Sequence, residues 1–317
     1  MNMWTARAVT AATASAAALA LAGCGGADAP ADSTGGDGLT VVAGFYPLEW
    51  AAQRVGGDRV DVSSLTPPGA EAHDLELAPQ DVAAVADADL LVYLDGFQPA
   101  LDEAAQNESA GTAWDAGQAA DLVPTAEEHA HEGETAEEHA HEDGAVDPHF
   151  WLDPVRLASV GDALADRLTE ADPDGAATYE QNAAALGADL EALDAEMQAG
   201  LAGCAVGTLV TGHDAFGYLG DRYGLEVVGI SGLSPSAEPS PAAQAEISKL
   251  VRERGVTTVY TETLVDPAVA ETVADEAGVT TAVLDPVESL TDESAGDDYL
   301  AVMRANAATL ATGQACT

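Results

Sequence analysis

The stretch 172–200, DPDGAATYEQNAAALGADLEALDAEMQAG, predicts one long helix in the middle of the chain. Its opening Asp172-Pro173 pair is a typical helix start, because proline fits the first helical position and lacks the N–H that would go unpaired there. Apolar side chains then recur at three- and four-residue spacing, at Leu186, Leu190, Leu193 and Met197. At 1.5 Å per residue such a helix would be about 40 Å long, enough to join two domains.

Short segments rich in β-branched residues lie on both sides of this helix and alternate with helical stretches. The predicted strands are Leu39–Phe45, Val60–Leu65, Leu90–Leu94, Thr208–Thr211, Glu226–Ile230, Thr257–Thr261 and Thr281–Leu284. The helical stretches include Leu48–Val55, Ala78–Ala86, Leu157–Glu170, Ala242–Arg254 and Pro267–Ala277. This alternation predicts βαβ units and parallel sheets. We therefore expect an α/β fold of two lobes, residues 39–155 and 204–317, joined by helices within 156–203.

The amino-acid composition argues against two classes of binding partner. The chain has 317 residues, a formal net charge of −45 and 47% hydrophobic residues. That hydrophobic content predicts a folded protein rather than a disordered acidic chain. A surface this negative repels phosphate backbones and anionic lipid headgroups, so we expect neither nucleic-acid binding nor electrostatic docking to a membrane.

Residues 1–23 are typical of an export signal, since one arginine precedes an uncharged run too short to span a membrane. The run closes in Leu21-Ala22-Gly23-Cys24, which resembles the lipobox of bacterial lipoproteins. We expect Cys24 to carry a lipid and residues 24–38 to be a flexible tether. The protein would then work outside the cytoplasm, held at the outer face of the cell membrane by its lipid alone. The alternative is an ordinary signal peptide with a chance cysteine.

Two further cysteines, Cys204 and Cys316, remain once Cys24 is lipidated. An even pair in an oxidising compartment favours a disulfide. Such a bond would close a loop of 112 residues and contribute about 4–5 kcal/mol in the chain-entropy model. The alternative is two buried free thiols.

One segment carries most of the histidines: TAEEHAHEGE at 125–134 is nearly repeated as TAEEHAHEDG at 135–144. Its 20 residues hold eight acids and no basic residue, so it cannot bury a core, and we expect a disordered surface loop over 124–146. Imidazoles and carboxylates both ligate divalent metals, which predicts weak metal capture by His129, His131, His139 and His141. The alternative is an acidic solvated loop with no binding role.

The other three histidines are His73, His149 and His213, and each follows a predicted strand or turn and leads into a helix. Asp285 ends the last predicted strand. In open α/β sheets, ligands bind at the carboxyl ends of the strands, so these four residues are placed to converge in a cleft between the lobes. Any one of them alone is more often part of a capped turn or a hydrogen-bonded core residue.

These residues lie in motifs that resemble the metal-binding lipoproteins of bacterial ABC importers for zinc and manganese. The most specific motif is DPHFWLDP at Asp147–Pro154, supported by HDAFGY at 213–218, RYGL at 222–225, GISG at 229–232 and EPSP at 238–241. The resemblance extends from about Val41 to Cys316. The stretch Pro67–Pro79 fits less closely, because the family often has a proline where Ala72 stands. A His-rich acidic insertion before DPHFWLDP is typical of the zinc branch.

The resemblance implies two α/β lobes joined by a rigid helix, with one metal buried between them. It assigns His73 and His149 from the N-terminal lobe, and His213 and Asp285 from the C-terminal lobe, as the ligands. Manganese members tend to carry a carboxylate where His213 stands. Three imidazoles and one carboxylate suit tetrahedral Zn²⁺, whereas Mn²⁺ favours more oxygen ligands. Zinc is therefore the expected metal and manganese the less favoured one.

Other carboxylates compete for the fourth ligand position. Glu262 follows a predicted strand and is placed either to ligate the metal or to support a histidine. Some zinc relatives use water or an acid next to the first histidine, which leaves Glu71 and Asp74 open. Support for the second imidazole nitrogens is expected from Asp147, Asp153 and Asp214, and packing of the cleft walls from Trp151, Phe216 and Tyr218.

The expected function is capture of Zn²⁺ outside the cytoplasm and its delivery to an ABC permease by a monomeric binding protein. A zinc hydrolase is disfavoured, because a catalytic zinc usually keeps an open coordination position and the chain has no His-Glu-x-x-His motif. We therefore expect no enzymatic activity. Two alternatives stay open: a manganese- or iron-binding component of the same type of importer, and a surface lipoprotein that stores zinc or acts as an adhesin.

Overall fold

The computed structural model describes residues 38–123 and 146–317. The predicted signal peptide, Cys24, nearly all of the tether and the tandem histidine repeat lie outside these ranges. Within the described ranges, no helix has both the length and the apolar character that crossing a bilayer requires.

The first half of the chain forms a parallel four-stranded sheet of β1 (Leu39–Ala43), β2 (Val60–Ser64), β3 (Leu90–Tyr93) and β4 (Ala113–Asp115), in the order β2-β1-β3-β4. Its helices are α1 (Tyr46–Gly56), α2 (Pro79–Asp87), α3 (Pro99–Glu108) and the short α4 (Gly117–Ala120). All three strands predicted here are present. Strand β4, which has three residues and lies at the sheet edge, is not among the predicted strands.

The second half repeats this plan. Its parallel sheet comprises β5 (Thr208–Thr211), β6 (Glu226–Gly229), β7 (Thr258–Thr261) and β8 (Thr280–Val283), in the order β6-β5-β7-β8. Its helices are α7 (Gly217–Tyr223), α8 (Pro241–Arg254), α9 (Ala268–Ala277) and α10 (Tyr299–Gly313). Parallel strands need crossover helices, which cover the sheet faces and leave the carboxyl ends of the strands open to one edge. The predicted pair of parallel sheets flanked by helices is confirmed.

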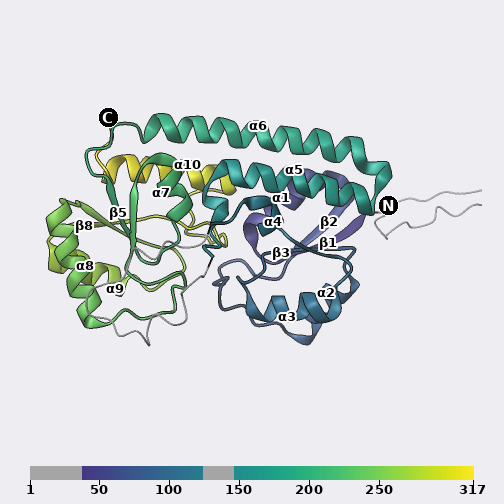
Figure 1. Cartoon of the computed structure of the whole chain (residues 1–317), viewed down its shortest axis with the longest axis horizontal. Helices are drawn as coiled ribbons and strands as arrows, with labels where there is room; N and C mark the ends of the chain where they lie inside the picture. Colours follow the sequence, from purple (N-terminus) through teal and green to yellow (C-terminus); the bar gives the residue numbers. More distant parts are fainter. Residues whose placement is uncertain (1–37, 124–145) are drawn as a thin grey trace, which may run out of the picture. The chain divides into compact units, whose positions relative to one another are not determined.

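Two helices connect the halves: α5 (Pro154–Ala171) and α6 (Ala176–Gly200), with a 3₁₀ turn, η4 (Pro173–Gly175), between them. Asp153 caps α5 by accepting from the Val155 N–H, and Pro154 fills the first helical position. Helix α6 packs on α5 and α1 and, further along, on α10, as its course in Figure 1 shows. The four apolar side chains predicted to form its buried stripe, Leu186, Leu190, Leu193 and Met197, are fully buried. The predicted long helix is confirmed.

A continuous apolar cluster runs through both halves by way of these helices. It includes Val41 and Val92 of the first sheet, Leu164 of α5, Leu190 of α6 and Leu209 of the second sheet. Burial of apolar area in one shared core ties the two halves together.

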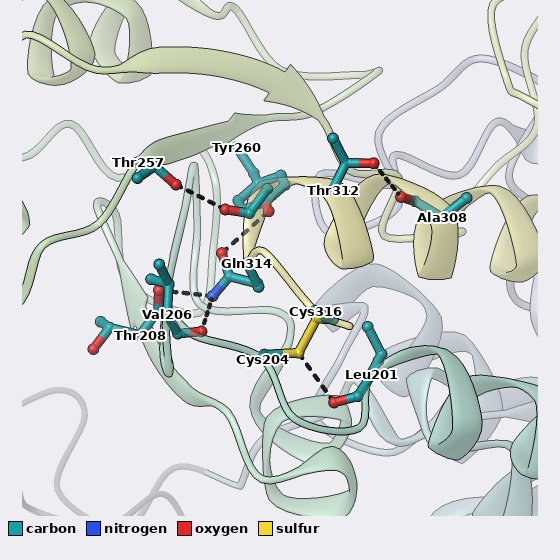
Figure 2. Close-up of a disulfide and its surroundings, with 11 residues drawn as sticks. Leu201, Cys204, Val206, Thr208, Thr257, Tyr260, Ala308, Thr312, Gln314 and Cys316 are labelled. Atoms are coloured by element: carbon teal, nitrogen blue, oxygen red, sulfur yellow. Dashed lines mark hydrogen bonds between the residues drawn. A yellow bond between two sulfur atoms is a disulfide. The ribbon is translucent and has the colours of Figure 1, made fainter.

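The chain end is fastened to the second sheet. The predicted disulfide between Cys204 and Cys316 is present, across a separation of 112 residues. Figure 2 shows Gln314 beside it: its Nε2 donates to the carbonyls of Val206 and Thr208, at 3.2 and 2.9 Å, and its Oε1 accepts from Tyr260 Oη–H at 3.2 Å. The amide therefore adds to the backbone hydrogen bond from the Val206 N–H to the Gln314 carbonyl, at 3.1 Å, where the end of α10 meets the start of β5.

Candidate metal centre

His149 is held by the Asp147–Pro154 block, which runs from Asp147 through the 3₁₀ turn η3 (Phe150–Leu152) into α5. Oδ1 of Asp147 accepts from both the backbone N–H of His149, at 2.9 Å, and its Nδ1, at 2.8 Å. Because the carboxylate can only accept, Nδ1 carries the proton and Nε2 is the nitrogen left to bind a metal. The second half fixes the block itself, since Trp151 donates from Nε1 to the Pro286 carbonyl at 2.8 Å.

His213 is held in the same way from the other sheet. It lies two residues after β5, and Glu262 directly follows β7, the neighbouring strand. Glu262 accepts the His213 backbone N–H at 2.8 Å and its Nδ1 at 2.5 Å. A Cβ at Gly212 would lie 2.5 Å from Glu262 Oε1, so this close approach requires glycine at that position. The arrangement leaves Nε2 of His213 free for a ligand.

His73 is held differently, in an irregular loop between β2 and α2. No carboxylate among the described residues accepts from its ring Nδ1. Its ring packs edge-on against Phe97, with centroids 4.6 Å apart. Gln98 steadies the loop by donating from Nε2 to the Ala72 carbonyl at 2.9 Å and to Thr66 Oγ1 at 3.1 Å. The ring is fixed by packing and by its backbone rather than by a charged partner.

The three histidines converge on one carboxylate, that of Glu288, in the segment after β8. Its Oε1 lies 3.6 Å from Nε2 of His73, 3.6 Å from Nε2 of His149 and 3.5 Å from Nε2 of His213. The Nε2 atoms of His73 and His149 are 3.3 Å apart, and all four ligand atoms lie within 4.8 Å of one another. Ligand atoms about 2.0–2.1 Å from a tetrahedral zinc are about 3.3 Å apart, so the cluster is nearly the size of such a site.

The cluster also contains polar atoms that the described protein leaves without hydrogen bonds. Nε2 of His213 and Oε1 of Glu288 are buried and have no hydrogen-bond partner there. Buried polar atoms almost always have a partner, because desolvation without one is costly. A cation between the four groups would satisfy both atoms at once. Three imidazoles and one carboxylate, closed off from solvent, are a donor set that zinc prefers over magnesium or calcium.

The charges of the site are strongly coupled. Burial alone would lower the pKa of His213, but the carboxylates of Glu262 and Glu288 raise it to about 10. Burial likewise opposes the charged form of His149, and Asp147 outweighs it, so that pKa is raised. The pKa of His73, which lacks such a partner, is lowered by burial. Burial would raise the pKa of Glu288, yet the three histidines hold it well below its usual range. The Glu288 carboxylate is therefore ionised, and a metal ion that binds beside it must displace the proton that the raised pKa keeps on His213.

The structure brings together three of the four residues predicted as ligands and leaves out Asp285. The Asp285 carboxylate is turned away from the histidines: Oδ1 accepts the Val287 N–H at 2.8 Å and Oδ2 accepts from Ser294 Oγ–H at 2.9 Å. The structure therefore does not place Asp285 in the cluster with the three histidines, because both of its oxygens are engaged elsewhere. Glu288 is the carboxylate that lies in the cluster, and it is not among the residues singled out from the sequence. The available signal was the Asp285-Pro286 turn, after which Glu288 is the first acid.

The remaining predicted acids lie around the cluster. Glu262 supports His213, and Asp147 supports His149. Glu71 accepts the His73 backbone N–H at 3.1 Å, and burial together with the nearby Glu288 charge raises the pKa of Glu71 to about 7. Asp153 caps α5 rather than contacting a histidine. Trp151, Phe216 and Tyr218 are buried in the apolar core.

A cavity of about 470 Å³ adjoins the cluster. Gly212 and Glu262 line it beside His213, and Glu71 and Asp74 line it beside His73. Two further acids, Glu238 and Asp266, lie on its walls. The ionisable side chains that line this cavity are therefore all acidic.

Comparison with known proteins gives matches over most of the chain. The profile described as "ZnuA: Zinc-uptake complex component A periplasmic" matches residues 41–313. The "Zinc-binding lipoprotein AdcA" of Streptococcus pneumoniae is 38% identical over 274 residues, which cover 84% of this chain and 54% of that protein. This chain thus spans about half the length of its AdcA relatives. The "High-affinity zinc uptake system protein ZnuA" of Bacillus subtilis is 36% identical over 90% of this chain and 91% of its own.

A solved structure agrees with these matches. The "Zn(II)-bound ZnuA-like domain of Streptococcus pneumoniae AdcA" superposes with a TM-score of 0.71 at 34% identity. The match covers 87% of this chain and 99% of that one. The two-sheet plan and the sequence motifs therefore point to the same group of proteins.

Proposed function

The chain belongs to the family of zinc-uptake complex component A, and from this premise we propose that it captures one Zn²⁺ ion outside the cytoplasm for import. The observation that carries the proposal is the convergence of three histidine Nε2 atoms on Glu288 Oε1 at 3.5–3.6 Å. The family is one of solute-binding transport proteins, not of enzymes. Four protein ligands would fill a tetrahedral zinc and leave no position for a reactive water, so we propose no catalytic activity for this chain.

His73, His149, His213 and Glu288 are the proposed ligands. Asp147 and Glu262 support the proposal, because each fixes the tautomer in which its histidine presents Nε2. Mn²⁺ favours more oxygen ligands than one carboxylate provides, which argues for zinc as the cargo. Iron or manganese import is the rival assignment.

Delivery to an ABC permease, with the protein anchored by lipid on Cys24 and acting as a monomer, completes the proposal. The family and the names of its lipoprotein relatives support it. The tandem histidine repeat is proposed to hold further zinc weakly through His129, His131, His139 and His141. Ordering a polar loop costs entropy, so this capture would be weaker than that of the buried cluster.

Competitive calorimetry with Zn²⁺ and Mn²⁺ tests the capture step. It uses the chain from Cys24 onward and a matched variant that lacks 125–144. Both proteins should bind one Zn²⁺ tightly, and only the complete chain should bind more Zn²⁺ weakly. Mn²⁺ binding of equal strength would favour the manganese assignment, and loss of the tight site on deletion would contradict the division between cluster and repeat.

The delivery step needs a cellular measurement. Deleting the gene should impair growth in zinc-depleted medium, and the wild-type gene should restore growth while a His149→Ala gene should not. Unimpaired growth of the deletion strain would favour a storage or adhesin role instead.

A further inference from the structure

The segment that carries Glu288 has an unusual backbone. Val287, directly before it, has φ +60°. Two other non-glycine residues of the described ranges, Asp121 and Ala315, also have positive φ, but neither is β-branched. A β-branched side chain in the left-handed region is a genuine outlier and persists only where its surroundings hold it. Val287 is fully buried, so the surroundings must be protein.

Asp285 forms the hydrogen bonds that support this backbone conformation. Its Oδ1 accepts the Val287 N–H at 2.8 Å, which closes the turn across Pro286. Its Oδ2 accepts from Ser294 at 2.9 Å, which fixes the carboxylate plane. Asn306, inside α10, accepts the Asp285 N–H at 3.0 Å and donates to the Asp285 carbonyl at 2.7 Å. Every backbone and side-chain polar group of Asp285 is thus engaged, and the residue is itself only 3% exposed.

The turn is also held on its far side by the first half of the chain. Trp151 donates to the Pro286 carbonyl at 2.8 Å, and Ser289 Oγ accepts the Gly69 N–H at 2.9 Å. Glu288 therefore lies between two anchored residues. Glu288 is only 2% exposed, and its Oε1 faces the three histidines.

We propose that Asp285 is a positioning residue that holds the left-handed turn at Val287 and so aims a single oxygen of Glu288 at the metal. The inference rests on the proposed function, because it concerns the same cluster. Its chemical consequence is selectivity. A carboxylate held in one orientation offers one oxygen and completes a four-coordinate site, which suits zinc, whereas a loosened one offers two oxygens and suits Mn²⁺ better.

Two substitutions separate positioning from ligation. Asp285→Ala removes both held oxygens. Asp285→Asn keeps an acceptor for the Val287 N–H, and its amide can donate to Ser294, but an amide is a far poorer zinc ligand than a carboxylate. Asp292→Ala, at an exposed acid of the same loop, is the matched control.

Competitive Zn²⁺/Mn²⁺ titration of the full chain is the measurement. Asp285→Ala should weaken zinc binding by about 10-fold or more, the usual effect of removing a group that orients a ligand, and should lower the ratio of zinc to manganese affinity. Asp285→Asn should lose less than that and keep the ratio. Adding Val287→Gly to Asp285→Ala should recover part of the loss, because glycine adopts the left-handed conformation unaided.

The outcomes distinguish a positioning role of Asp285 from a role as a metal ligand. Equal loss in Asp285→Asn and Asp285→Ala would overturn the proposal and return Asp285 to the ligands, and an unchanged Asp285→Ala would show that the turn needs no such hold. If circular dichroism shows that Asp285→Ala does not fold, the Asp285→Asn titration decides alone: wild-type affinity and ratio support positioning, and a large loss overturns it. A wild-type chain that binds no zinc would refute the proposed function instead.

Discussion

His149 and His213 differ from His73 in how their imidazole rings are held in place. His149 and His213 each have one carboxylate that accepts both the backbone N–H and the ring Nδ1–H. His73 has neither arrangement, lies in an irregular loop, and keeps a side chain that is 9% exposed against 0% and 1% for the others. The site therefore has a fixed part, made by His149, His213 and Glu288, and one adjustable ligand at its edge.

This difference suggests an order for release. A metal leaves most easily by losing first the ligand whose displacement breaks fewest other contacts. His73 can turn without breaking a hydrogen bond between its Nδ1 and a carboxylate, whereas His149 and His213 cannot. We therefore expect dissociation to begin at the loop between β2 and α2 that carries His73, because the two halves share an apolar core.

The largest expected effect comes from removing the ligands themselves. His149→Ala and His213→Ala should each weaken zinc binding by well over about 100-fold, because a ligand is lost and a supporting carboxylate is left buried without its partner. His73→Ala should be the mildest of the three, since water can enter at its more exposed position. Calorimetric titration of the three variants measures this ranking. An equal or greater loss of zinc affinity in His73→Ala would contradict the proposed difference between His73 and the other two histidines.

Removing the supporting carboxylates should have an intermediate effect. Glu262→Gln and Asp147→Asn should each cost about 10- to 100-fold in zinc affinity, because the charge that orients the imidazole is lost while its shape is kept. Glu71→Gln is the control beside His73: Glu71 accepts from the backbone N–H groups of His73 and Asp74, and among the described residues it bonds no imidazole, so the change should fall below that range. Similar losses in all three variants would mean that His73 is supported as firmly as the others.

We also expect the histidines to differ in the protons that they release when zinc binds. The pKa of His213 is raised to about 10, so this histidine is protonated at neutral pH in the metal-free protein; the pKa of His149 is also raised, by Asp147, and burial lowers that of His73. Zinc needs neutral imidazole, so binding should expel about one to two protons and weaken as the pH falls. Calorimetry in buffers of different ionisation enthalpy counts the protons. Glu262→Gln should reduce the number, and release of none would contradict the assigned protonation.

The smallest effect on affinity should come from the linking helix, although its effect on stability is large. Asp194 of α6 accepts from Arg222 at 2.6 Å twice and from Tyr223 at 3.1 Å, and the Arg222 guanidinium holds the pKa of Asp194 below its usual range. Asp194→Ala should cost about 2 kcal/mol of unfolding free energy, less than a fully buried pair, and leave zinc affinity unchanged.

Its control is Glu196→Ala on the same helix, where the pair with Arg304 is half exposed on both sides and its loss should not be measurable. Because the pKa of Asp194 is depressed in the folded state, its contribution is complete above about pH 4 and is lost as the pH falls below that. Denaturant unfolding at pH 7 and pH 3 measures both. A change in zinc affinity in Asp194→Ala would show that the scaffold and the site are not separable.

Much of the fold could be predicted because its signals are local. The buried stripe of α6 and the seven longer strands are marked by spacing and by β-branched residues, which depend only on neighbours in sequence. Strand β4 has three residues, Ala113–Asp115, and pairs only with β3, so neither its length nor its alternation distinguishes it from a loop. Its existence depends on the edge that β3 offers, a tertiary feature.

The site shows the same limit more sharply. The three histidines were accessible from motifs and from their places after strands. The fourth ligand was not, because the choice between Asp285 and Glu288 depends on how the chain turns at Val287. A valine with φ +60° contradicts its own conformational preference, and Asp285, which accepts the Val287 N–H, is itself bonded to Asn306, 21 residues after it in α10. No local pattern contains that information.

The bond between Cys204 and Cys316 makes the second half of the chain a covalent ring that contains His213, Glu262 and Glu288. A protease that cuts one peptide bond between the two cysteines opens the ring without releasing a fragment, so both proposed ligands of that half stay on the same molecule. The damage would be invisible by size on a non-reducing gel and would appear only after reduction. For a protein proposed to work outside the cytoplasm, the disulfide therefore means that a single cleavage within this ring does not separate the two proposed ligands.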